Sequence, residues 1–285
     1  MRDRARIPEA VQRVVAAALE EDLGAKGDIT TDVVIPVDRR AVGRLVARQP
    51  LIVAGLSVAR EVFRQLDPAL GFVAHRADGE PVAAGDPLAT VTGAARPILR
   101  GERTALNFVM RMSGIATAAR RAVDEISGTG ARILDTRKTA PGLRVLDKLA
   151  VAAGGADNHR GGLFDAVMIK DTHLALVGSL AEAVARVLGA GVAKGLVTVE
   201  VGTLRQLEEA IAAGAGRALL DNMGLDEIRR AVAIAKGRIV LEASGRLRPG
   251  RLRAVAETGV DCLSVGFLTH SSRAADVAME VGPES

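Results

Sequence analysis

The chain has 285 residues, enough to bury a substantial core and to form two domains or one large one. It is 48% apolar and 25% charged, but its only aromatic residues are five Phe, so few rings are available for base stacking and single-stranded nucleic-acid binding is disfavoured. The formal net charge is +4, with Arg spread through amphipathic segments, which indicates a solvated surface more than a nucleic-acid partner.

The single cysteine, Cys262, lies in an apolar run. One thiol forms no intrachain disulfide and no cysteine-based metal site, so a reducing compartment is expected. The start of the chain is charged and has no apolar h-region, so we expect no signal peptide. No apolar run approaches the ~20 residues of a membrane span. These features predict a cytoplasmic protein without a membrane partner.

The first hundred residues are expected to form a small α/β unit with an antiparallel sheet. An apolar stripe at helical spacing predicts a helix that begins at Pro8, and the segment GDITTD (27–32) is interpreted as a turn. A second amphipathic helix is predicted at 56–66. Alternation and turn dipeptides predict strands at 41–48, 51–54, 71–75, 81–83 and 88–91.

A long helix is predicted next, over 102–126, with a break near Ser113-Gly114. Beyond it, apolar strands alternate with helices, and Ser179 and Thr203 fit helix N-caps. Strands are predicted at 133–134, 166–169, 196–201, 218–220, 239–241 and 262–265. Helices are predicted near 142–153, 179–189, 203–213, 225–236 and 249–258. Such repeats predict a parallel sheet buried on both faces, and six of them without a split favour an α/β barrel.

Two domains follow from this change of pattern. Residues 1–110 are predicted to form the N-terminal α/β unit, and residues 111–274 the barrel. The tail 275–285 alternates apolar and polar residues, which predicts a last strand that returns to the N-terminal sheet.

Chemistry is expected at the carboxyl ends of the barrel strands, where α/β barrels place their active sites. Nearly every predicted strand ends in charged residues or in Ser and Gly of the kind that binds phosphate. These residues are Asp135, Thr136, Arg137, Lys138, Lys170, Asp171, Glu200, Asp221, Asn222, Glu242, Ser244, Gly245 and Gly266. One of them alone could be a solvated strand end, but six strands with both signs of charge indicate a site.

The cations and the carboxylates suggest different tasks. Arg and Lys side chains clamp carboxylates or phosphates, and the candidates are Arg137, Lys138, Arg160 and Lys170. Glu200 and Asp221 could bind ribose hydroxyls, hold hydrated Mg²⁺, or stabilise a cationic transition state.

Phosphate binding is expected late in the barrel, where loops of such folds often hold it. The candidate runs are Ser244-Gly245 and Val265-Gly266-Phe267. The predicted ligand therefore contains a phosphorylated sugar and further negative charge, with Mg²⁺ as cofactor.

Two residues leave alternatives open. His159, in a glycine-rich loop, could be a general base, a donor to a carboxylate, or structural. Lys170 could form a Schiff base as in aldolases, although the neighbouring cations favour a polyanionic ligand.

The stretch DTRKTAPGLRVLDKLAVAAGGADNHRGGLFDAVMIKDTH (135–173) resembles the central signature of the quinolinate phosphoribosyltransferases. Further motifs of that family follow in family order: GDITTD, VAGLSVAREVF, GERTALNFVMRMSGIAT, VTVEVGTLRQLEEAI, LLDNM, LEASGRL and ETGVDCLSVGFLTHS. The resemblance implies an N-terminal α/β open sandwich and a C-terminal incomplete α/β barrel, the type II phosphoribosyltransferase fold. It also implies phosphoribosyl transfer from phosphoribosyl pyrophosphate to quinolinate with Mg²⁺ and loss of CO₂, giving nicotinate mononucleotide for NAD biosynthesis.

The resemblance also implies roles for individual residues. Arg137, Lys138, His159 and Arg160, with Thr136 beside them, would hold the two quinolinate carboxylates. Lys170 would reach a carboxylate or the donor, and Glu200 and Asp221 the ribose and metal. The 5′-phosphate would lie at Ser244, Gly245 and Gly266. Arg246, Val265 and Phe267, which neighbour these residues, complete the predicted substrate-binding set. Arg103 would enter the partner subunit's site, so a homodimer, or a hexamer built from it, is expected.

Three positions depart from the family pattern: Thr172, Thr198 and Arg246, of which Arg246 bears on the site. The motifs are partly shared with a pyrophosphorylase-like relative associated with molybdenum transport. A phosphoribosyltransferase for another pyridine or purine-like acid, and a non-enzymatic nucleic-acid-binding protein, remain alternative hypotheses.

Overall fold

The computed structural model describes residues 7–284. We expect no signal peptide at the start of the chain, and residues 1–6 of that stretch lie outside the described residues. The chain forms two compact units. Of the described residues, the first unit combines 7–120, 139–155 and 272–284, and the second combines 121–138 and 156–271. The first unit is thus assembled from three separate stretches of sequence.

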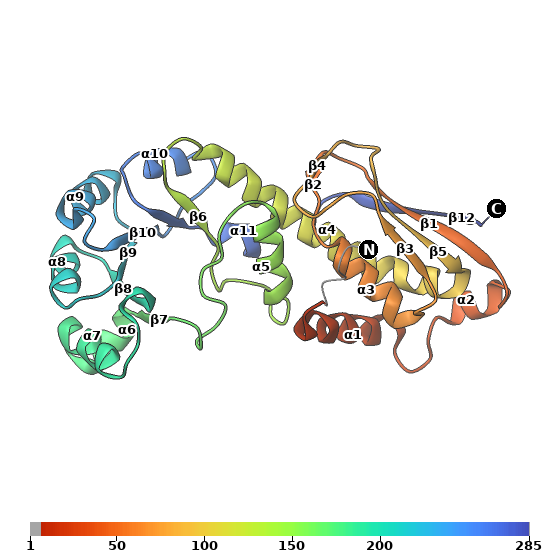
Figure 1. Ribbon diagram of the computed structural model, residues 1–285, viewed down its shortest axis with the longest axis horizontal. Helices are drawn as coiled ribbons and strands as arrows, with labels where there is room; N and C mark the ends of the chain where they lie inside the picture. The colour runs from red at the N-terminus through yellow and green to blue at the C-terminus, as the bar shows by residue number, and fades with distance from the viewer. Residues whose placement is uncertain (1–6, 285) are drawn as a thin grey trace. The chain divides into compact units, whose positions relative to one another are not determined.

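The first unit contains a four-stranded antiparallel sheet, a two-stranded pair and five helices among its described residues (Figure 1). Its helices are α1 (Glu9–Leu23), α2 (Ile29–Val34), α3 (Leu56–Leu66), α4 (Ala95–Glu125), which belongs to this unit as far as Arg120, and α5 (Arg144–Ala153). Its strands are β1 (Arg40–Ala47), β2 (Leu51–Ile52), β3 (Gly71–Ala74), β4 (Pro81–Val82), β5 (Pro87–Ala94) and β12 (Val277–Pro283).

The sheet of this unit has the order β12-β1-β5-β3. The strand expected in the tail, β12, pairs antiparallel with β1, and Val42 lies opposite Gly282. Apolar side chains at alternate positions of β1 and β5 are fully buried, as Leu45 and Leu88 are. They share the core with Phe63 of α3, and the sheet therefore has one apolar face.

Two predictions about this unit are wrong. GDITTD is not a plain turn, because Asp28 caps α2 by accepting hydrogen bonds from the backbone N–H groups of Thr30 and Thr31. The long helix does not break at Ser113-Gly114, and α4 runs unbroken over 31 residues. Both residues are buried, and the Ser113 hydroxyl bonds to the backbone N–H and carbonyl of Ala54. The small residues permit close packing and do not interrupt the helix.

The second unit is an open barrel of parallel strands with helices outside it (Figure 1). Its strands are β6 (Arg132–Leu134), β7 (Val167–Ile169), β8 (Val197–Val201), β9 (Arg217–Asp221), β10 (Val240–Ser244) and β11 (Cys262–Ser264). Its helices are α6 (Asp171–Val177), α7 (Leu180–Gly189), the 3₁₀ turn η1 (Lys194–Leu196), α8 (Leu204–Ala212), α9 (Leu225–Ala235), α10 (Leu252–Ala256) and α11 (Phe267–His270).

The strand order is β6-β11-β10-β9-β8-β7, and every pairing in it is parallel. Within residues 7–284, no ladder joins β7 back to β6, so the barrel stays open between its first two strands. Successive helices contact one another from α6 to α10 and cover the outside of the strands. The predicted incomplete α/β barrel is confirmed, as are the caps of α7 and α8 by Ser179 and Thr203.

None of the helices formed by the described residues has both the length and the apolar character needed to cross a membrane.

Candidate active site

A pocket of about 320 Å³ lies at the carboxyl ends of the barrel strands. In parallel strands every second side chain points to the same face, so residues from all six strands can meet there. The pocket is lined by Thr136, Arg137, Lys138, His159, Arg160, Met168, Lys170, Glu200, Leu219, Asp221, Glu242, Ser244 and Ser264. It thus brings together nine of the fifteen residues with a predicted catalytic or substrate-binding role.

Cations line one part of the pocket. Arg160 is half-buried, and its guanidinium donates to the carbonyl of Ala166 over 3.0 Å. Burial and the nearby positive charge of Arg137 lower the pKa of Arg160, and Asp165 only partly counteracts them. Two guanidinium groups that repel each other in a partly desolvated pocket are stabilised by an anion bound between them. This part of the pocket is therefore suited to a carboxylate or phosphate.

Lys138 is held in a defined turn after β6. The hydroxyl of Thr136 accepts a hydrogen bond from the backbone N–H of Lys138 over 3.0 Å. The hydroxyl of Thr269 donates to the carbonyl of Lys138 over 2.8 Å. The turn that carries Arg137 and Lys138 is thus tied at both sides, and the two cations do not depend on a free loop for their positions.

Carboxylates line another part of the pocket, at the ends of β8 and β9. The ammonium nitrogen of Lys170 lies 3.6 Å from a carboxylate oxygen of Glu200, which is 18% exposed. Asp221 accepts a hydrogen bond from the side-chain amide of Asn222 over 2.9 Å. Both carboxylates retain oxygen lone pairs that can accept from hydroxyls or bind a hydrated cation.

A fully buried carboxylate, Glu242, also lines the pocket. It accepts a hydrogen bond from the Ser264 hydroxyl and lies 3.4 Å from His159 Nε2 and 3.4 Å from Arg217 Nη1. Burial alone would raise its pKa, but His159, Ser264 and Arg217 together lower the pKa below the ordinary value. Glu242 is therefore an ionised group whose partners belong to the protein.

A second pocket of about 380 Å³ adjoins the first and shares Thr136, Lys138, Ser244 and Ser264 with it. It contains the predicted phosphate residues Gly245, Arg246, Gly266 and Phe267, together with Leu247, Arg248, Pro249, His270 and Ser271. Gly245 has φ +92°, and a Cβ there would collide with the side chain of Asn222. Only glycine fits, so the backbone forms part of the pocket wall.

Of the fifteen residues with a predicted substrate role, two line neither pocket. Asp135, Asp171 and Asn222, predicted at the strand ends without a role, also line neither. Arg103 is exposed on α4, in the first unit. Val265 is fully buried, and its backbone N–H donates to the carbonyl of Leu134 over 2.9 Å.

Three pocket residues were not predicted from the sequence: Met168, Leu219 and Ser264. Glu242 was predicted at this rim by the strand pattern but was given no role. Glu242 carries a signal that the sequence contains, a lone carboxylate within the apolar run VLEAS two residues before Ser244. The period of two in a strand places these two residues on the same face. Met168 lies two residues before Lys170 and therefore faces the same side of its strand. It supplies an apolar wall of the pocket, which no polar motif in the sequence indicates.

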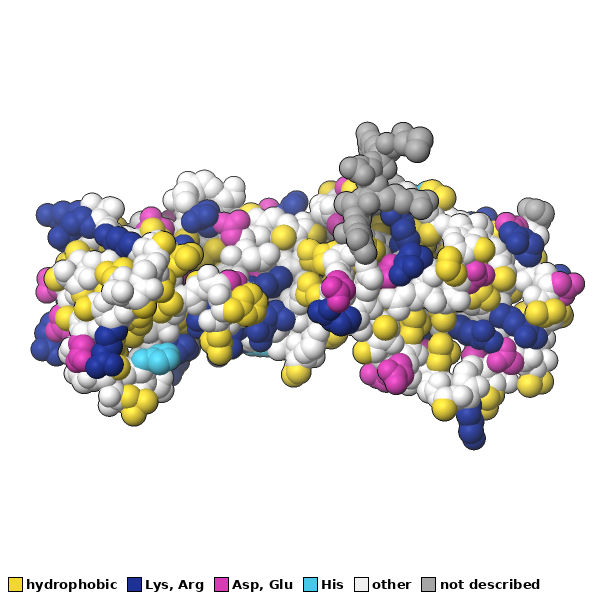
Figure 2. All heavy atoms as spheres, turned by 60° about the horizontal axis from the view of Figure 1, so that its bottom comes forward, with side chains coloured by type: hydrophobic (Ala, Val, Ile, Leu, Met, Phe, Trp, Pro, Cys, Tyr) yellow, Lys and Arg dark blue, Asp and Glu magenta, His cyan; other side chains and the backbone are white. Residues whose placement is uncertain are grey.

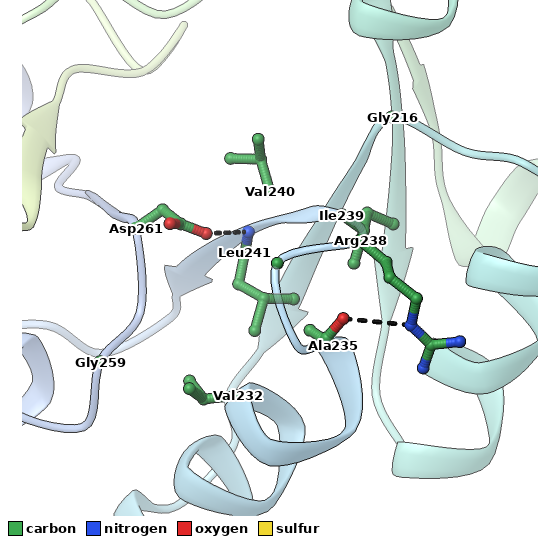
Figure 3. A pocket seen from close by; sticks show the side chains of 10 residues that line it. Gly216, Val232, Ala235, Arg238, Ile239, Val240, Leu241, Gly259 and Asp261 are labelled. Carbon is green, nitrogen blue, oxygen red and sulfur yellow. Dashed lines mark hydrogen bonds between the residues drawn. The ribbon is translucent and has the colours of Figure 1, made fainter.

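A third pocket, of about 220 Å³, lies at the opposite ends of β9 and β10 and contains no predicted site residue (Figure 3). The Asp261 carboxylate accepts from the backbone N–H of Leu241 over 2.7 Å, and Arg238 donates to the carbonyl of Ala235 over 3.2 Å. Its charged groups thus have backbone partners, and its remaining wall is mostly apolar or glycine. This end of a barrel usually serves stability.

On the face of the molecule drawn in Figure 2, Lys and Arg are not gathered in one patch. The face drawn in Figure 2 carries Lys and Arg in several separate groups, between acidic and apolar side chains. The strand-end pocket instead combines four predicted cations with three carboxylates. An open α/β barrel with such a rim belongs to the class of enzymes that bind phosphorylated, multiply anionic substrates.

The comparisons with known proteins identify the family. The C-terminal domain of quinolinate phosphoribosyl transferase matches residues 115–280, and the N-terminal domain of the same family matches residues 28–113. A nicotinate-nucleotide pyrophosphorylase [carboxylating] of Mycobacterium leprae is 42% identical, over 96% of this chain and 98% of its own. A probable nicotinate-nucleotide pyrophosphorylase [carboxylating] of Bacillus subtilis is 41% identical, over 92% of this chain and 90% of its own.

A solved structure points to the same family. The NadC structure from Streptococcus pyogenes superposes with a TM-score of 0.93 at 34% identity, covering 99% of this chain and all of that one. The chain belongs to the quinolinate phosphoribosyltransferase family.

Proposed function

We propose that this chain transfers the phosphoribosyl group of phosphoribosyl pyrophosphate to the ring nitrogen of quinolinate. The products are nicotinate mononucleotide, pyrophosphate and CO₂, on the de novo route to NAD. Family membership supports the reaction, and one observation carries it at the level of residues. The strand-end pocket combines cations for a dicarboxylate with carboxylates for a cationic sugar, beside a second pocket lined by further cations.

The acceptor is held by cations. Arg137, Lys138 and Arg160 bind the two carboxylates of quinolinate, and the resemblance adds His159 and Thr136 to this set. A guanidinium binds a carboxylate through two parallel N–H donors, whereas Lys acts as a point charge. The pyridine ring packs against Met168 and Leu219, the two apolar side chains in the lining.

The donor occupies both pockets. Its 5′-phosphate binds at Ser244, Gly245, Arg246, Gly266 and Phe267, with Val265 beside them. Its ribose hydroxyls donate to Glu200 and Asp221. Lys170, 3.6 Å from Glu200, lies between acceptor and donor and neutralises charge on either one.

We expect the protein to catalyse the chemical step by electrostatic stabilisation. As the bond from the sugar to pyrophosphate breaks, the ribose becomes an oxocarbenium-like cation, which Glu200 and Asp221 stabilise. The ring nitrogen then forms the new bond to the sugar and becomes cationic. The positive charge on that nitrogen stabilises the electron pair that remains on the adjacent ring carbon as its carboxylate leaves as CO₂. That carbon then takes a proton from water, which gives the product. The protein contributes orientation and fixed charge, and needs no covalent intermediate.

Mg²⁺ is part of the proposal. Among residues 7–284, no group of three or more His, Cys, Asp or Glu side chains is placed to hold a metal. Glu200 and Asp221 nevertheless fit this ion, because Mg²⁺ in enzymes is commonly held by one or two carboxylates together with substrate phosphates and water. When bound, Mg²⁺ neutralises the leaving pyrophosphate.

A homodimer with a shared site completes the proposal, and a hexamer would be built from such dimers. Arg103 is exposed and lines neither pocket of its own barrel, which supports a role for it in the partner's site. A cytoplasmic location is also proposed, supported by the single cysteine, which is a buried free thiol.

Steady-state assays test the function directly. With phosphoribosyl pyrophosphate as donor, quinolinate should be converted with release of CO₂, and nicotinate should be a poor acceptor because it leaves one cationic position unpaired. Use of nicotinate with quinolinate ignored would refute the assignment of two carboxylates.

Metal removal tests the cofactor. Treatment with a chelator should abolish turnover, and Mg²⁺ should restore it. Ca²⁺, which prefers longer bonds and more ligands, should restore it poorly. Full turnover after complete chelation would exclude Mg²⁺.

A further inference from the structure

The loop between β10 and α10, residues 245–251, presents two arginines to the second pocket (Figure 1). Arg246 and Arg248 are both exposed, and both line this pocket but not the first one. In the proposed function Arg246 binds the 5′-phosphate of the donor, whereas Arg248 has no role. Among residues 7–284, no ion pair joins either guanidinium to a carboxylate, whereas the nearby Arg253 pairs with Glu257. Both arginines are therefore available to an anionic ligand.

The backbone of this loop is anchored at both ends. At its start, the carbonyl of Ser244 accepts a hydrogen bond from the backbone N–H of Asn222 over 3.0 Å. At its end, the carboxylate of Glu125 accepts from the backbone N–H groups of Gly250 and Leu252 over 3.0 and 2.7 Å. The arginines thus extend from a fixed backbone, and mainly their side chains lose freedom when an anion binds, which lowers the cost of binding.

The charges in the second pocket are of one sign. Its lining contains Lys138, Arg246 and Arg248, and none of the described Asp and Glu residues lines it. The first pocket differs, because Glu200 and Asp221 lie among its cations. A phosphate group in the second pocket therefore meets no opposing carboxylate, and a second phosphate linked to it would meet none either.

The linings of the two pockets give an extended ligand a direction. Glu200 and Asp221, which accept from the ribose hydroxyls in the proposed function, line only the first pocket. Ser244 lines both pockets, so a 5′-phosphate bound there lies at their junction. Arg248 lines only the second pocket. A group attached to the 5′-phosphate, on the side away from the ribose, would therefore extend toward Arg248.

The second pocket is also large for a single phosphate. Its volume is about 380 Å³. One phosphate fills on the order of 120 Å³ if each of its four oxygens takes the ~30 Å³ share of a water molecule in the liquid. The pocket thus has room for a second phosphate beside the first.

We propose that the second pocket binds two linked phosphates, the 5′-phosphate at Ser244 and Arg246 and a second phosphate at Arg248. The ligands of this class are 5′-diphosphate esters of a pyridine nucleoside, that is, dinucleotides formed by nucleotidyl transfer onto the 5′-phosphate of the product. Such a ligand occupies the product's position and excludes the donor, so it inhibits the enzyme. The identity of the nucleoside rests on the proposed function, whereas the preference for a diphosphate does not depend on turnover.

Calorimetry tests the number of phosphates bound. The full-length enzyme, with a chelator and without Mg²⁺, is titrated with nicotinate mononucleotide and with nicotinate adenine dinucleotide, the 5′-diphosphate ester of the same nucleoside. The dinucleotide should bind about tenfold more tightly, the gain expected from one charge-assisted contact. The advantage should shrink at high salt, because exposed charges are screened. Equal affinities, or weaker binding of the dinucleotide, would overturn the proposal.

Variants of the loop separate the second phosphate from the adenosine. Arg248→Ser should bring the two Kd values within about threefold of each other, and Arg248→Lys should keep most of the difference because it keeps the charge. Arg251→Ser is the matched control, since Arg251 is exposed and lines neither pocket, and it should keep the tenfold difference. An unchanged difference in Arg248→Ser would mean that the adenosine accounts for it. Equal weakening of both ligands would place Arg248 at the 5′-phosphate, and either result refutes the proposal.

Inhibition kinetics distinguish this inference from the proposed function. At a fixed quinolinate concentration, both nucleotides should raise the apparent KM for phosphoribosyl pyrophosphate, with a Ki about tenfold lower for the dinucleotide. Turnover of quinolinate with equal Ki values would refute the inference and leave the function standing. Absence of quinolinate turnover, with tighter binding of the dinucleotide in calorimetry, would refute the proposed function and leave the diphosphate preference standing.

Discussion

Arg246 combines a strained backbone with a useful charge. Its φ is +52°, and among residues 7–284 the other non-glycine residues with positive φ are Asn222 and Lys236. A left-handed conformation costs a residue with a Cβ roughly 1 kcal/mol or more. Arg246 is nevertheless exposed in the second pocket, close in sequence to Arg248. A cation at the proposed phosphate site offers a reason for tolerating that cost.

Arg246→Gly should therefore separate stability from binding. Glycine adopts positive φ without a steric penalty, so Tm should stay the same or rise. The lost cation should raise KM for phosphoribosyl pyrophosphate roughly 3- to 10-fold, the effect of ~1 kcal/mol. Lys236→Gly is the matched control, because Lys236 has φ +47° at the end of α9 and lies outside both strand-end pockets. Lys236→Gly should change Tm in the same direction as Arg246→Gly and leave KM for phosphoribosyl pyrophosphate unaltered. An equal effect of both variants on this KM would refute a role for Arg246 in binding the donor.

Glu242 predicts a pH dependence of stability. Burial would raise its pKa, but His159, Ser264 and Arg217 lower the pKa below its unfolded value. The ionised form is thus favoured by folding, and its contribution is present above about pH 4.3 and lost as the pH falls through the folded pKa. Urea unfolding of wild type and Glu242→Gln should differ most near pH 7, with the difference shrinking toward pH 4. A difference that grows on acidification would contradict the ionised assignment.

The site residues that sequence predicts are those at strand ends. Apolar runs predict where strands end, so the sequence alone assigns Lys170, Glu200 and Asp221 to the rim of the barrel. The sequence also assigns Glu242 to that rim, at the end of the strand predicted at 239–241, but Glu242 lies within β10. Its inward direction depends on a register that a shift of one residue would reverse. The distance between His159 and Glu242 depends on loop geometry, which residue spacing does not determine.

At the scale of elements, α4 is a helix whose composition wrongly suggests a break. Ser113-Gly114 resembles an interruption, but a Cβ on Gly114 would collide with the backbone carbonyl of Arg273. Glycine is therefore present for the close approach of the segment before β12.

The sequence pattern did not predict α2 and α6, and the reason differs from that for α4. They span only six and seven residues and contain the exposed apolar side chains Val33 and Leu176, so no buried stripe reveals them.

Gly114→Ala should destabilise the protein although alanine is the better helix former. Helix propensity alone would add up to about 1 kcal/mol of stability, whereas the collision with backbone should cost ~1–3 kcal/mol. Gly189→Ala provides the comparison, since Gly189 is in α7 and a Cβ there meets nothing within 4 Å. It should be neutral or stabilising in the same urea titration. A stable Gly114→Ala variant would mean that the segment around Arg273 can move away.

At the scale of the whole molecule, a shared active site would make activity a property of the assembly. Arg103 precedes the barrel strands in sequence and is exposed on α4, whereas Arg137 lines the strand-end pocket. If Arg103 acts in the partner's site, neither single variant supplies a complete site within its own homodimer.

Mixed dimers test this arrangement. Arg103→Ala and Arg137→Ala should each lose most activity, by about 10- to 100-fold for one charge-assisted contact. After the two are unfolded and refolded together, some mixed dimers should contain one intact site and one doubly defective site. Activity should rise toward a quarter of wild type, and a mixture no more active than its parts would exclude sharing.

The pairing of β12 with β1 has a consequence for how the chain folds. The whole barrel lies in sequence between these two strands, which meet in register from Ala41 to Ala47. During synthesis the ribosome therefore delivers every barrel strand before it delivers the partner of β1. Until then β1 has one open edge, the kind of surface that recruits other chains. Strand β12 thus closes the sheet to which β1 belongs, and because these contacts are so distant in sequence we expect their formation to be slow.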